Sequence, residues 1–218
     1  MQKSAGDRPI LYPSIVGNIE HCINDFDKIP DSRKRALHDM ARFIEKKMEA
    51  GETAALMFIC THNSRRSHIA QLWAQAAAAY YGITNVIAYS GGTEVTAFNL
   101  RAVKTMQALG FRITQTTTSE NPVYEVRFSD NVPLMKVFSK KYDDQQNPGI
   151  NFGAIMTCSH ADQNCPFVNG AEIRLSMSFD DPKDFDGTPE EAAMYKERAY
   201  QIGREILYSF SQIQILNN

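Results

Sequence analysis

The residues best suited to chemistry in this chain form one short segment that begins with a cysteine. It reads Cys60-Thr61-His62-Asn63-Ser64-Arg65-Arg66-Ser67. An apolar run, residues 54–59, precedes it, and an alanine-rich pattern with helical period follows from Ile69 to Tyr81. The segment therefore lies at a strand-to-helix turn, where backbone N–H groups and the helix dipole favour negative charge. We expect it to form a loop that binds a tetrahedral oxyanion.

Each polar residue of this loop has an expected task. The field of the loop favours the thiolate of Cys60, which is the nucleophilic form. Arg66 can hold two anion oxygens with its planar guanidinium, and Ser67 is placed to hydrogen-bond the sulfur. The remaining residues are expected to bind substrate: Thr61, His62, Asn63, Ser64 and Arg65. The alternative is an ordinary half-buried cysteine in a loop, because free cysteines are commonly core residues.

The loop resembles the phosphate loop of low-molecular-weight protein tyrosine phosphatases and of the thioredoxin-coupled arsenate reductases that share their fold. The resemblance covers about residues 53–115 and 152–215. Asp181 precedes a proline and matches the position at which this superfamily keeps its general acid. Cys158 and Cys165 lie in a segment similar to the redox segment of the reductases, which the phosphatases lack. The resemblance implies that these three residues, with the loop cysteine and arginine, are catalytic.

The chain departs from the family pattern at several positions. His62 replaces a common glycine, and histidine tolerates a left-handed backbone better than most residues. Arg65 stands where a cysteine is often found. Gln71 replaces a glutamate that belongs to an alkali-ion site in some reductases, so we expect no metal. Residues 183–185 lack the tyrosines that usually follow the acid in the phosphatases, which weakens the case for a phosphotyrosine substrate.

The remainder of the chain alternates between strand and helix patterns. Strands are expected at about 53–59, 85–90, 154–157 and 172–175, and helices at 69–81, 97–109 and 189–211. This alternation predicts an α/β fold with a flavodoxin-like, parallel four-stranded sheet and helices on both faces. In such sheets, sites form at the carboxyl ends of the strands. Cys60, Cys158 and Asp181 follow three different strands, so we expect them to share one edge of the sheet.

Two segments are expected to be additions to this fold. Residues 1–52 read as an N-terminal helical extension that breaks near Pro30, with Asp31 or Ser32 as N-cap. Residues 53–218 form the phosphatase-like catalytic domain, and residues 118–150 within it read as a β-hairpin insertion. The insertion is interpreted as a decoration of the fold or, alternatively, as a flap over the site.

Composition limits the class of protein. The chain has 218 residues, is 43% hydrophobic and carries a net charge of −2. These values fit a globular protein and give no electrostatic reason to expect nucleic acid or a membrane surface as partner. Residues 1–7 contain no apolar leader, and no apolar stretch reaches spanning length, so a cytoplasmic location is expected. The spacing of Cys158 and Cys165 argues against zinc, and no cofactor is expected.

The cysteine pair has a geometric requirement. A disulfide needs Cα atoms about 4.4–6.8 Å apart, whereas seven helical residues span about 10.5 Å. If the segment is helical when reduced, Cys158 and Cys165 can pair only after it unwinds. Cys22 has no partner in any motif and is interpreted as a core residue.

The hypothesis is arsenate reduction coupled to thioredoxin or a similar dithiol reductant. Cys60 attacks arsenate, Asp181 protonates the departing oxygen, and the next two thiols remove the oxidising equivalents in turn. Asp180 would favour the protonated form of Asp181 by like-charge repulsion, although Asp-Asp-Pro alone could be a plain turn. The first alternative is a phosphatase that works through a phosphocysteine, and the second is a non-catalytic oxyanion or redox sensor.

Overall fold

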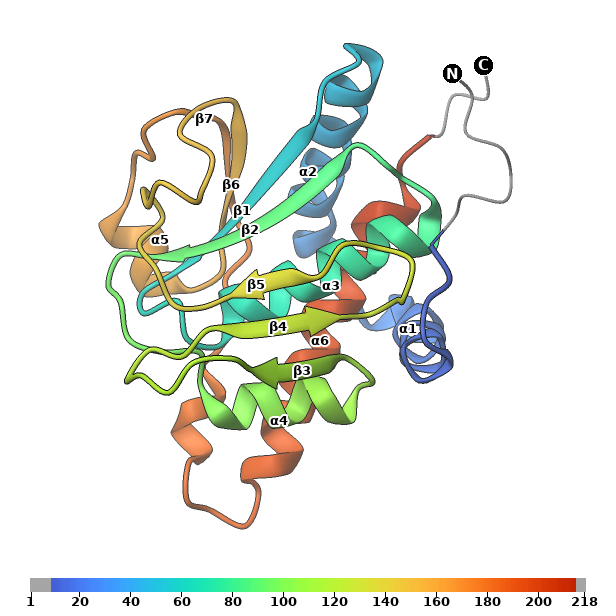
Figure 1. Ribbon diagram of the computed structural model, residues 1–218. Coiled ribbons are helices and arrows are strands. Elements are labelled where there is room, and N and C mark those ends of the chain that lie inside the picture. Colours follow the sequence, from blue (N-terminus) through green and yellow to red (C-terminus); the bar gives the residue numbers. More distant parts are fainter. Residues whose placement is uncertain (1–8, 215–218) are drawn as a thin grey trace.

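In the computed structural model, residues 9–214 are described, and residues 1–7, on which the expectation of no leader rests, lie outside this range (Figure 1). The helices are α1 (Pro13–Asn24), α2 (Asp31–Glu49), α3 (Arg66–Tyr81), α4 (Leu100–Ala108), α5 (Ser159–Asn164) and α6 (Glu191–Ser211), with short 3₁₀ turns η1 (Phe26–Lys28) and η2 (Pro182–Phe185). The strands are β1 (Ala54–Cys60), β2 (Val86–Gly92), β3 (Arg112–Gln115), β4 (Tyr124–Arg127), β5 (Met135–Val137), β6 (Phe152–Met156) and β7 (Ala171–Ser176).

The main sheet is parallel, with the strand order β2-β1-β6-β7, which confirms the expected fold class. From the central strand β1, the chain crosses to β2 on one side and later enters β6 on the other. The order therefore reverses between β1 and β6, and ligands of such sheets bind at the carboxyl end of this switch point. Ile59 pairs with Met156 there. Cys60 and Cys158 follow these paired residues, so the fold brings both cysteines to the switch point.

Alternate side chains of β1 pack into two different cores. Leu56 and Phe58 belong to the larger core, which includes buried residues of α3 and α6. Met57 and Ile59 belong to a smaller core with Val168 and with Ala161 of α5. Both faces of the sheet are therefore covered, but the second face is covered by one short helix and by loops rather than by long helices.

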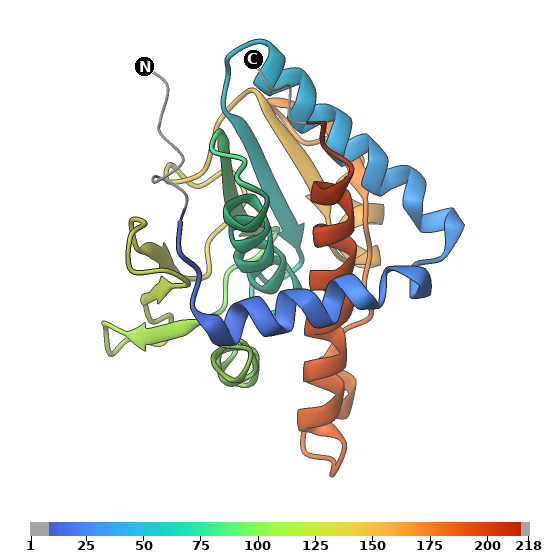
Figure 2. The ribbon, with the colours of Figure 1, turned by 90° about the vertical axis from the view of Figure 1, so that its right-hand side faces the viewer.

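The N-terminal helices belong to the larger core. Figure 2 shows α1 crossing α6 and α2 running beside it, and both contribute buried residues to that core. The predicted N-cap of α2 is wrong, because Pro30 occupies that position. Asp31 is instead the first helical residue, where its carboxylate pairs with Lys34 at 2.7 Å. Among the residues that the structure describes, no helix is long and apolar enough to cross a membrane.

The insertion contains the expected hairpin as part of a larger sheet. β4 and β5 pair in antiparallel fashion, with Tyr124 opposite Val137. An additional strand, β3, pairs with the other edge of β4, giving the order β3-β4-β5 (Figure 1). This strand was not expected from the sequence, since only Ile113 among its four residues is buried.

Candidate active site

Cys60 ends β1, and its sulfur lies in a buried hydrogen-bonded group. Ser67, in the first turn of α3, places its Oγ 3.1 Å from the Sγ of Cys60. Asn63 donates from Nδ2 to the same Oγ at 2.9 Å. Because the serine oxygen accepts from the asparagine, its own proton is free to point at the sulfur. Ser67 therefore makes the contact with the sulfur that was expected from the sequence.

The backbone strain of the loop lies at Asn63, not at His62. Asn63 has a φ of 43°, in the left-handed region that asparagine tolerates better than most residues. The His62 imidazole instead lies 3.3 Å from a carboxylate oxygen of Glu94. The loop also needs Gly92 as its neighbour, because a Cβ there would lie 2.7 Å from the amide nitrogen of Asn63 and 2.8 Å from the carbonyl oxygen of Thr61.

The segment that follows β5 braces the loop. The hydroxyl of Ser139 donates to the carbonyl of His62 at 2.9 Å, and the backbone N–H of Lys140 donates to Oδ1 of Asn63 at 2.8 Å. The Lys140 side chain is buried, and this burial lowers its pKa to about 8. The insertion therefore supports the loop of residues 60–67 through two residues that follow β5, a role that no motif in the sequence indicated.

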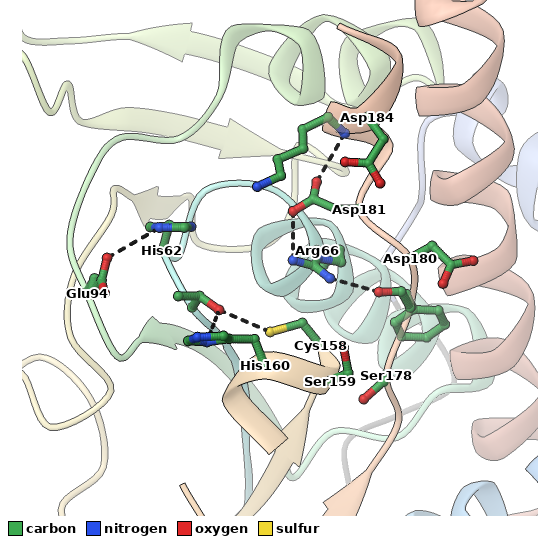
Figure 3. A pocket seen from close by; sticks show the side chains of 13 residues that line it. His62, Arg66, Glu94, Cys158, Ser159, His160, Ser178, Asp180, Asp181 and Asp184 are labelled. Atoms are coloured by element: carbon green, nitrogen blue, oxygen red, sulfur yellow. Dashed lines mark hydrogen bonds and ion pairs between the residues drawn. The ribbon is translucent and has the colours of Figure 1, made fainter. Parts of the chain in front are cut away.

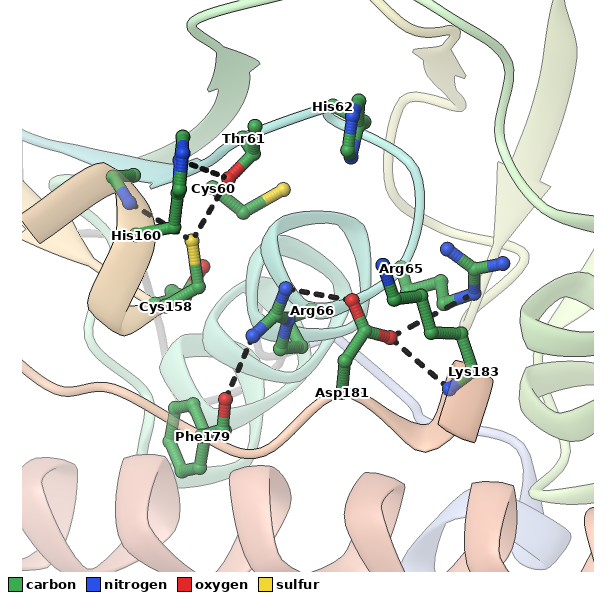
Figure 4. Close-up of polar contacts among 12 residues, drawn as sticks. Cys60, Thr61, His62, Arg65, Arg66, Cys158, His160, Phe179, Asp181 and Lys183 are labelled. Atoms are coloured by element: carbon green, nitrogen blue, oxygen red, sulfur yellow. Dashed lines mark hydrogen bonds and ion pairs between the residues drawn. The ribbon is translucent and has the colours of Figure 1, made fainter. Parts of the chain in front are cut away.

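Arg66 is held by the opposite wall of the site. Its guanidinium donates to Oδ2 of Asp181 at 2.7 Å and to the carbonyl of Phe179 at 2.8 Å (Figure 4). Its buried Nε–H has no hydrogen-bond partner within the described residues. An unsatisfied buried donor is unfavourable, so an anion in the loop would find one N–H of Arg66 without a competing acceptor.

Two residues expected to bind substrate turn their side chains elsewhere. Ser64 donates from its hydroxyl to the carbonyl of Ala97 at 2.7 Å. Arg65 donates from Nε to the hydroxyl of Tyr195 at 2.8 Å and lies 3.5 Å from Asp186. Their side chains therefore tie the loop to neighbouring elements, and Nε of Arg65 also lies 3.9 Å from a carboxylate oxygen of Asp181.

The two neighbouring aspartates face different arginines. Asp181 accepts from Arg66 and also from the backbone N–H of Lys183 at 3.1 Å. The side chain of Asp180 is 90% exposed and pairs with Arg198 of α6 at 3.1 Å. Figure 3 shows the two carboxylates pointing apart. The expected repulsion between them therefore has no structural basis, whereas the position of Asp181 across from the loop agrees with the sequence.

Cys158 and Cys165 cap the two ends of α5. Cys158 is 1% exposed, and its sulfur accepts from the N–H of Ala161 at 3.3 Å and lies 3.4 Å from the Thr61 hydroxyl. Cys165 is partly exposed, and both thiols are free. The intervening segment is helical, so a bond between these cysteines requires α5 to unwind. Cys22 is buried in α1, as expected, and burial raises its pKa to about 12.

Three residues, which we call the α5 clamp, hold this helix against β7. Arg174 donates from Nη2 to both the carbonyl and Oδ1 of Asp162 at 2.6 Å. Ser176 donates to the other oxygen of the same carboxylate. Arg174 also donates from Nε to the carbonyl of Cys165 at 3.0 Å. The clamp therefore restrains the end of α5 that carries the more exposed thiol.

Several of the residues described above line a cavity of about 510 Å³ (Figure 3). Its lining includes Thr61, Arg66, Cys158, His160, Asp181 and Lys183. Sequence reasoning missed His160, whose position beside the loop depends on how α5 packs. Within residues 9–214, no group of three or more His, Cys, Asp or Glu side chains is arranged to hold a metal ion.

The chain is similar to proteins named arsenate reductase. It is 30% identical over 128 residues to that of Bacillus cereus strain 03BB102, covering 58% of this chain and 75% of that protein. It is 28% identical over 152 residues to that of Halalkalibacterium halodurans, covering 69% and 91%. A solved arsenate reductase "in the phosphate binding state" aligns with a TM-score of 0.49 and 16% identity, over 74% of this chain and all of that one. No family model matches. The chain belongs to the arsenate reductase family.

Proposed function

We propose that the protein reduces arsenate to arsenite at the loop of residues 60–67 and is returned to its thiol form by thioredoxin or a similar dithiol protein. The observation that carries this proposal is the position of Cys158. Its buried sulfur contacts the hydroxyl of Thr61, the residue that follows the nucleophile Cys60. A phosphatase discharges its intermediate with water and does not need a second thiol at this place for turnover.

The first step uses the loop and the opposite wall. Arsenate replaces Asp181 as the partner of Arg66, and the freed carboxyl can take up the proton that it later donates. The thiolate of Cys60 attacks arsenic, and the departing hydroxide leaves as water with the proton from Asp181. The product is a thiolate ester of arsenic(V) held by the loop amides and Arg66.

Two thiol exchanges complete the turnover. Cys158 attacks the sulfur of Cys60, and the electron pair of the breaking S–As bond leaves with arsenic as arsenite. Cys165 then attacks Cys158, frees Cys60 and leaves a Cys158–Cys165 disulfide. An external dithiol reduces this bond, and Cys165 is the first accessible sulfur because it alone of these three thiols is not fully buried.

One comparison of activities tests this function. Purified protein is supplied with arsenate, thioredoxin, thioredoxin reductase and NADPH, and a parallel sample is supplied with an aryl phosphate. We expect arsenate-dependent NADPH oxidation that requires thioredoxin, and little phosphate release. Rapid aryl phosphate hydrolysis without arsenate reduction would support the phosphatase alternative instead.

The two aspartates provide a matched pair of variants. Asp181→Asn keeps an oxygen to accept from Arg66 but cannot donate a proton, and losing a general acid costs about 10²–10⁴ in rate. We expect a loss in this range when the formation of the arsenic adduct is followed by rapid quench. Asp180→Asn removes only an exposed ion pair with Arg198 and should change the rate by no more than a few fold. Equal effects of the two variants would remove Asp181 from the mechanism.

A further inference from the structure

A chain of three side chains connects Cys158 to the mouth of the cavity. The Thr61 hydroxyl lies 3.4 Å from the sulfur of Cys158 and 3.2 Å from Nδ1 of His160 (Figure 4). Cys158 and Thr61 are buried, whereas His160 is exposed. The hydroxyl therefore bridges a thiol that water cannot reach and an imidazole that water can reach.

Cys158 needs such a connection because it must lose a proton before it can attack. Only the thiolate is nucleophilic, and the hydrogen bonds of this sulfur are to Thr61 and to the N–H of Ala161. The amide N–H is a donor and cannot take the proton of the thiol. Asp181 serves the earlier step, at Cys60, and it is bonded to Arg66 on the other wall of the cavity. His160 is the basic group that the threonine hydroxyl reaches.

We propose that His160 receives, through the Thr61 hydroxyl, the proton that Cys158 loses before it attacks Cys60. This proposal rests on the proposed function, because only a reductase uses that attack. His160 acts through Thr61 and does not touch the reacting sulfur. It is therefore a positioning residue that sets the protonation state of Cys158.

The transfer balances in protons and electrons. The S–H of Cys158 donates its proton to Oγ1 of Thr61 as the hydroxyl proton passes to Nδ1 of neutral His160. The thiolate then forms an S–S bond with Cys60, and the S–As bond breaks. The two thiols lose two electrons and arsenic gains them, passing from arsenic(V) to arsenic(III). His160 afterwards releases its proton to solvent at the cavity mouth.

The surroundings of His160 carry both signs of charge. Besides His160 and Cys158, the charged or titratable groups that line the same cavity are the basic residues His62, Arg66 and Lys183 and the acidic residues Glu94, Asp180, Asp181 and Asp184. On its own helix, Asp162 is engaged by Arg174. A role for His160 as proton acceptor should therefore appear as a pH dependence of the disulfide-forming step.

The test isolates that step. In a Cys165→Ser background, the reaction stops at the Cys60–Cys158 disulfide, whose formation after mixing with arsenate is followed by quench and mass spectrometry. His160→Asn places an oxygen near the position of Nδ1, so it can accept from Thr61 but cannot hold a proton. His21→Asn, on α1, is the matched control. The affinity of each variant for inorganic phosphate, measured by calorimetry, reports whether the anion site is intact.

We expect His160→Asn to slow disulfide formation by about 10² at neutral pH, the lower end of general-base effects. The pH dependence of the parent rate should be lost in this variant. Thr61→Val should have a similar effect, and the double variant should be no slower than Thr61→Val alone, because both changes break one connection.

Three outcomes would overturn the proposal. The first is an unchanged rate and pH profile in His160→Asn, and the second is an additive double variant. The third is a loss of phosphate affinity as large as the loss of rate, which would assign His160 to anion binding. Failure of the parent to form any Cys60–Cys158 disulfide would instead reject the proposed function itself, so the two failures are distinguishable.

Discussion

Replacement of Cys60 by serine is expected to abolish arsenate reduction, with a loss on the order of 10⁶, the size observed when an enzyme loses its nucleophile. A serine hydroxyl is a much weaker nucleophile than a thiolate, and it cannot take part in a disulfide. The hydrogen bonds between Asn63, Ser67 and the bracing segment do not need the sulfur, so the fold should persist. Arsenite formation over time is the measurement.

Cys22→Ala is the matched control for the loss of Cys60. Cys22 is buried in α1 and takes no part in the site, so this variant should retain activity although it can lose some stability. Phosphate binding to Cys60→Ser should remain measurable because the loop amides and Arg66 are unchanged. Full activity of Cys60→Ser would reject the reductase and the phosphatase mechanisms together.

Replacement of Cys165 by serine is expected to permit one turnover and to stop the second. The attack of Cys158 on Cys60 still occurs, but no thiol follows to resolve the disulfide. One equivalent of arsenite should be released, and peptide mapping should find a trapped Cys60–Cys158 bond. Wild-type protein treated with excess arsenate should instead carry a Cys158–Cys165 bond and lose the mass of two hydrogens.

Cys158→Ser tests whether the transfer of oxidising equivalents from Cys60 to Cys165 passes through Cys158. That variant should stop before arsenite is released and should show no disulfide, whereas hydrolysis of an aryl phosphate, if any occurs, should survive both changes. The reductase mechanism would be wrong if the three cysteines remained reduced after arsenate treatment while phosphate esters were hydrolysed at useful rates.

The main sheet could be predicted from local patterns because its strands are buried and apolar. The expected strand at 53–59 corresponds to β1, Ala54–Cys60, and the expected helix at 189–211 corresponds to α6, Glu191–Ser211. The strand β3 could not be predicted in this way. It is short, mostly exposed, and formed by pairing with β4 across a long loop. Its stability depends on a partner that its own residues do not specify.

In the candidate site too, the features set by neighbouring residues could be predicted, and those that depend on distant residues could not. The residue types of the loop indicate an anion, a nucleophile and a serine beside the sulfur, and these are local relations. The contact between Thr61 and His160 and the bond from Lys140 to Asn63 join residues far apart in sequence. The side-chain directions of Ser64 and Arg65 could likewise not be predicted from the sequence spacing, because these side chains donate hydrogen bonds to Ala97 and Tyr195, which are distant in sequence.

The α5 clamp affects the reduction potential of the Cys158–Cys165 pair. The bonds from Arg174 to Asp162 and to the Cys165 carbonyl exist while α5 is helical, and the disulfide requires this helix to unwind. The clamp therefore stabilises the dithiol relative to the disulfide. Stabilising the reduced form raises the reduction potential of such a pair.

The size of this effect can be measured by equilibrating Cys158 and Cys165 with glutathione mixtures in the absence of arsenate. Arg174→Gln removes charge-assisted bonds, and a loss of about 1.4 kcal/mol would lower the potential by about 30 mV. An unchanged potential would show that the clamp bonds persist in the oxidised form. With the clamp intact, electrons from an external dithiol flow into the oxidised pair more readily, and each reduction also rebuilds the helix that holds Cys158 beside the loop.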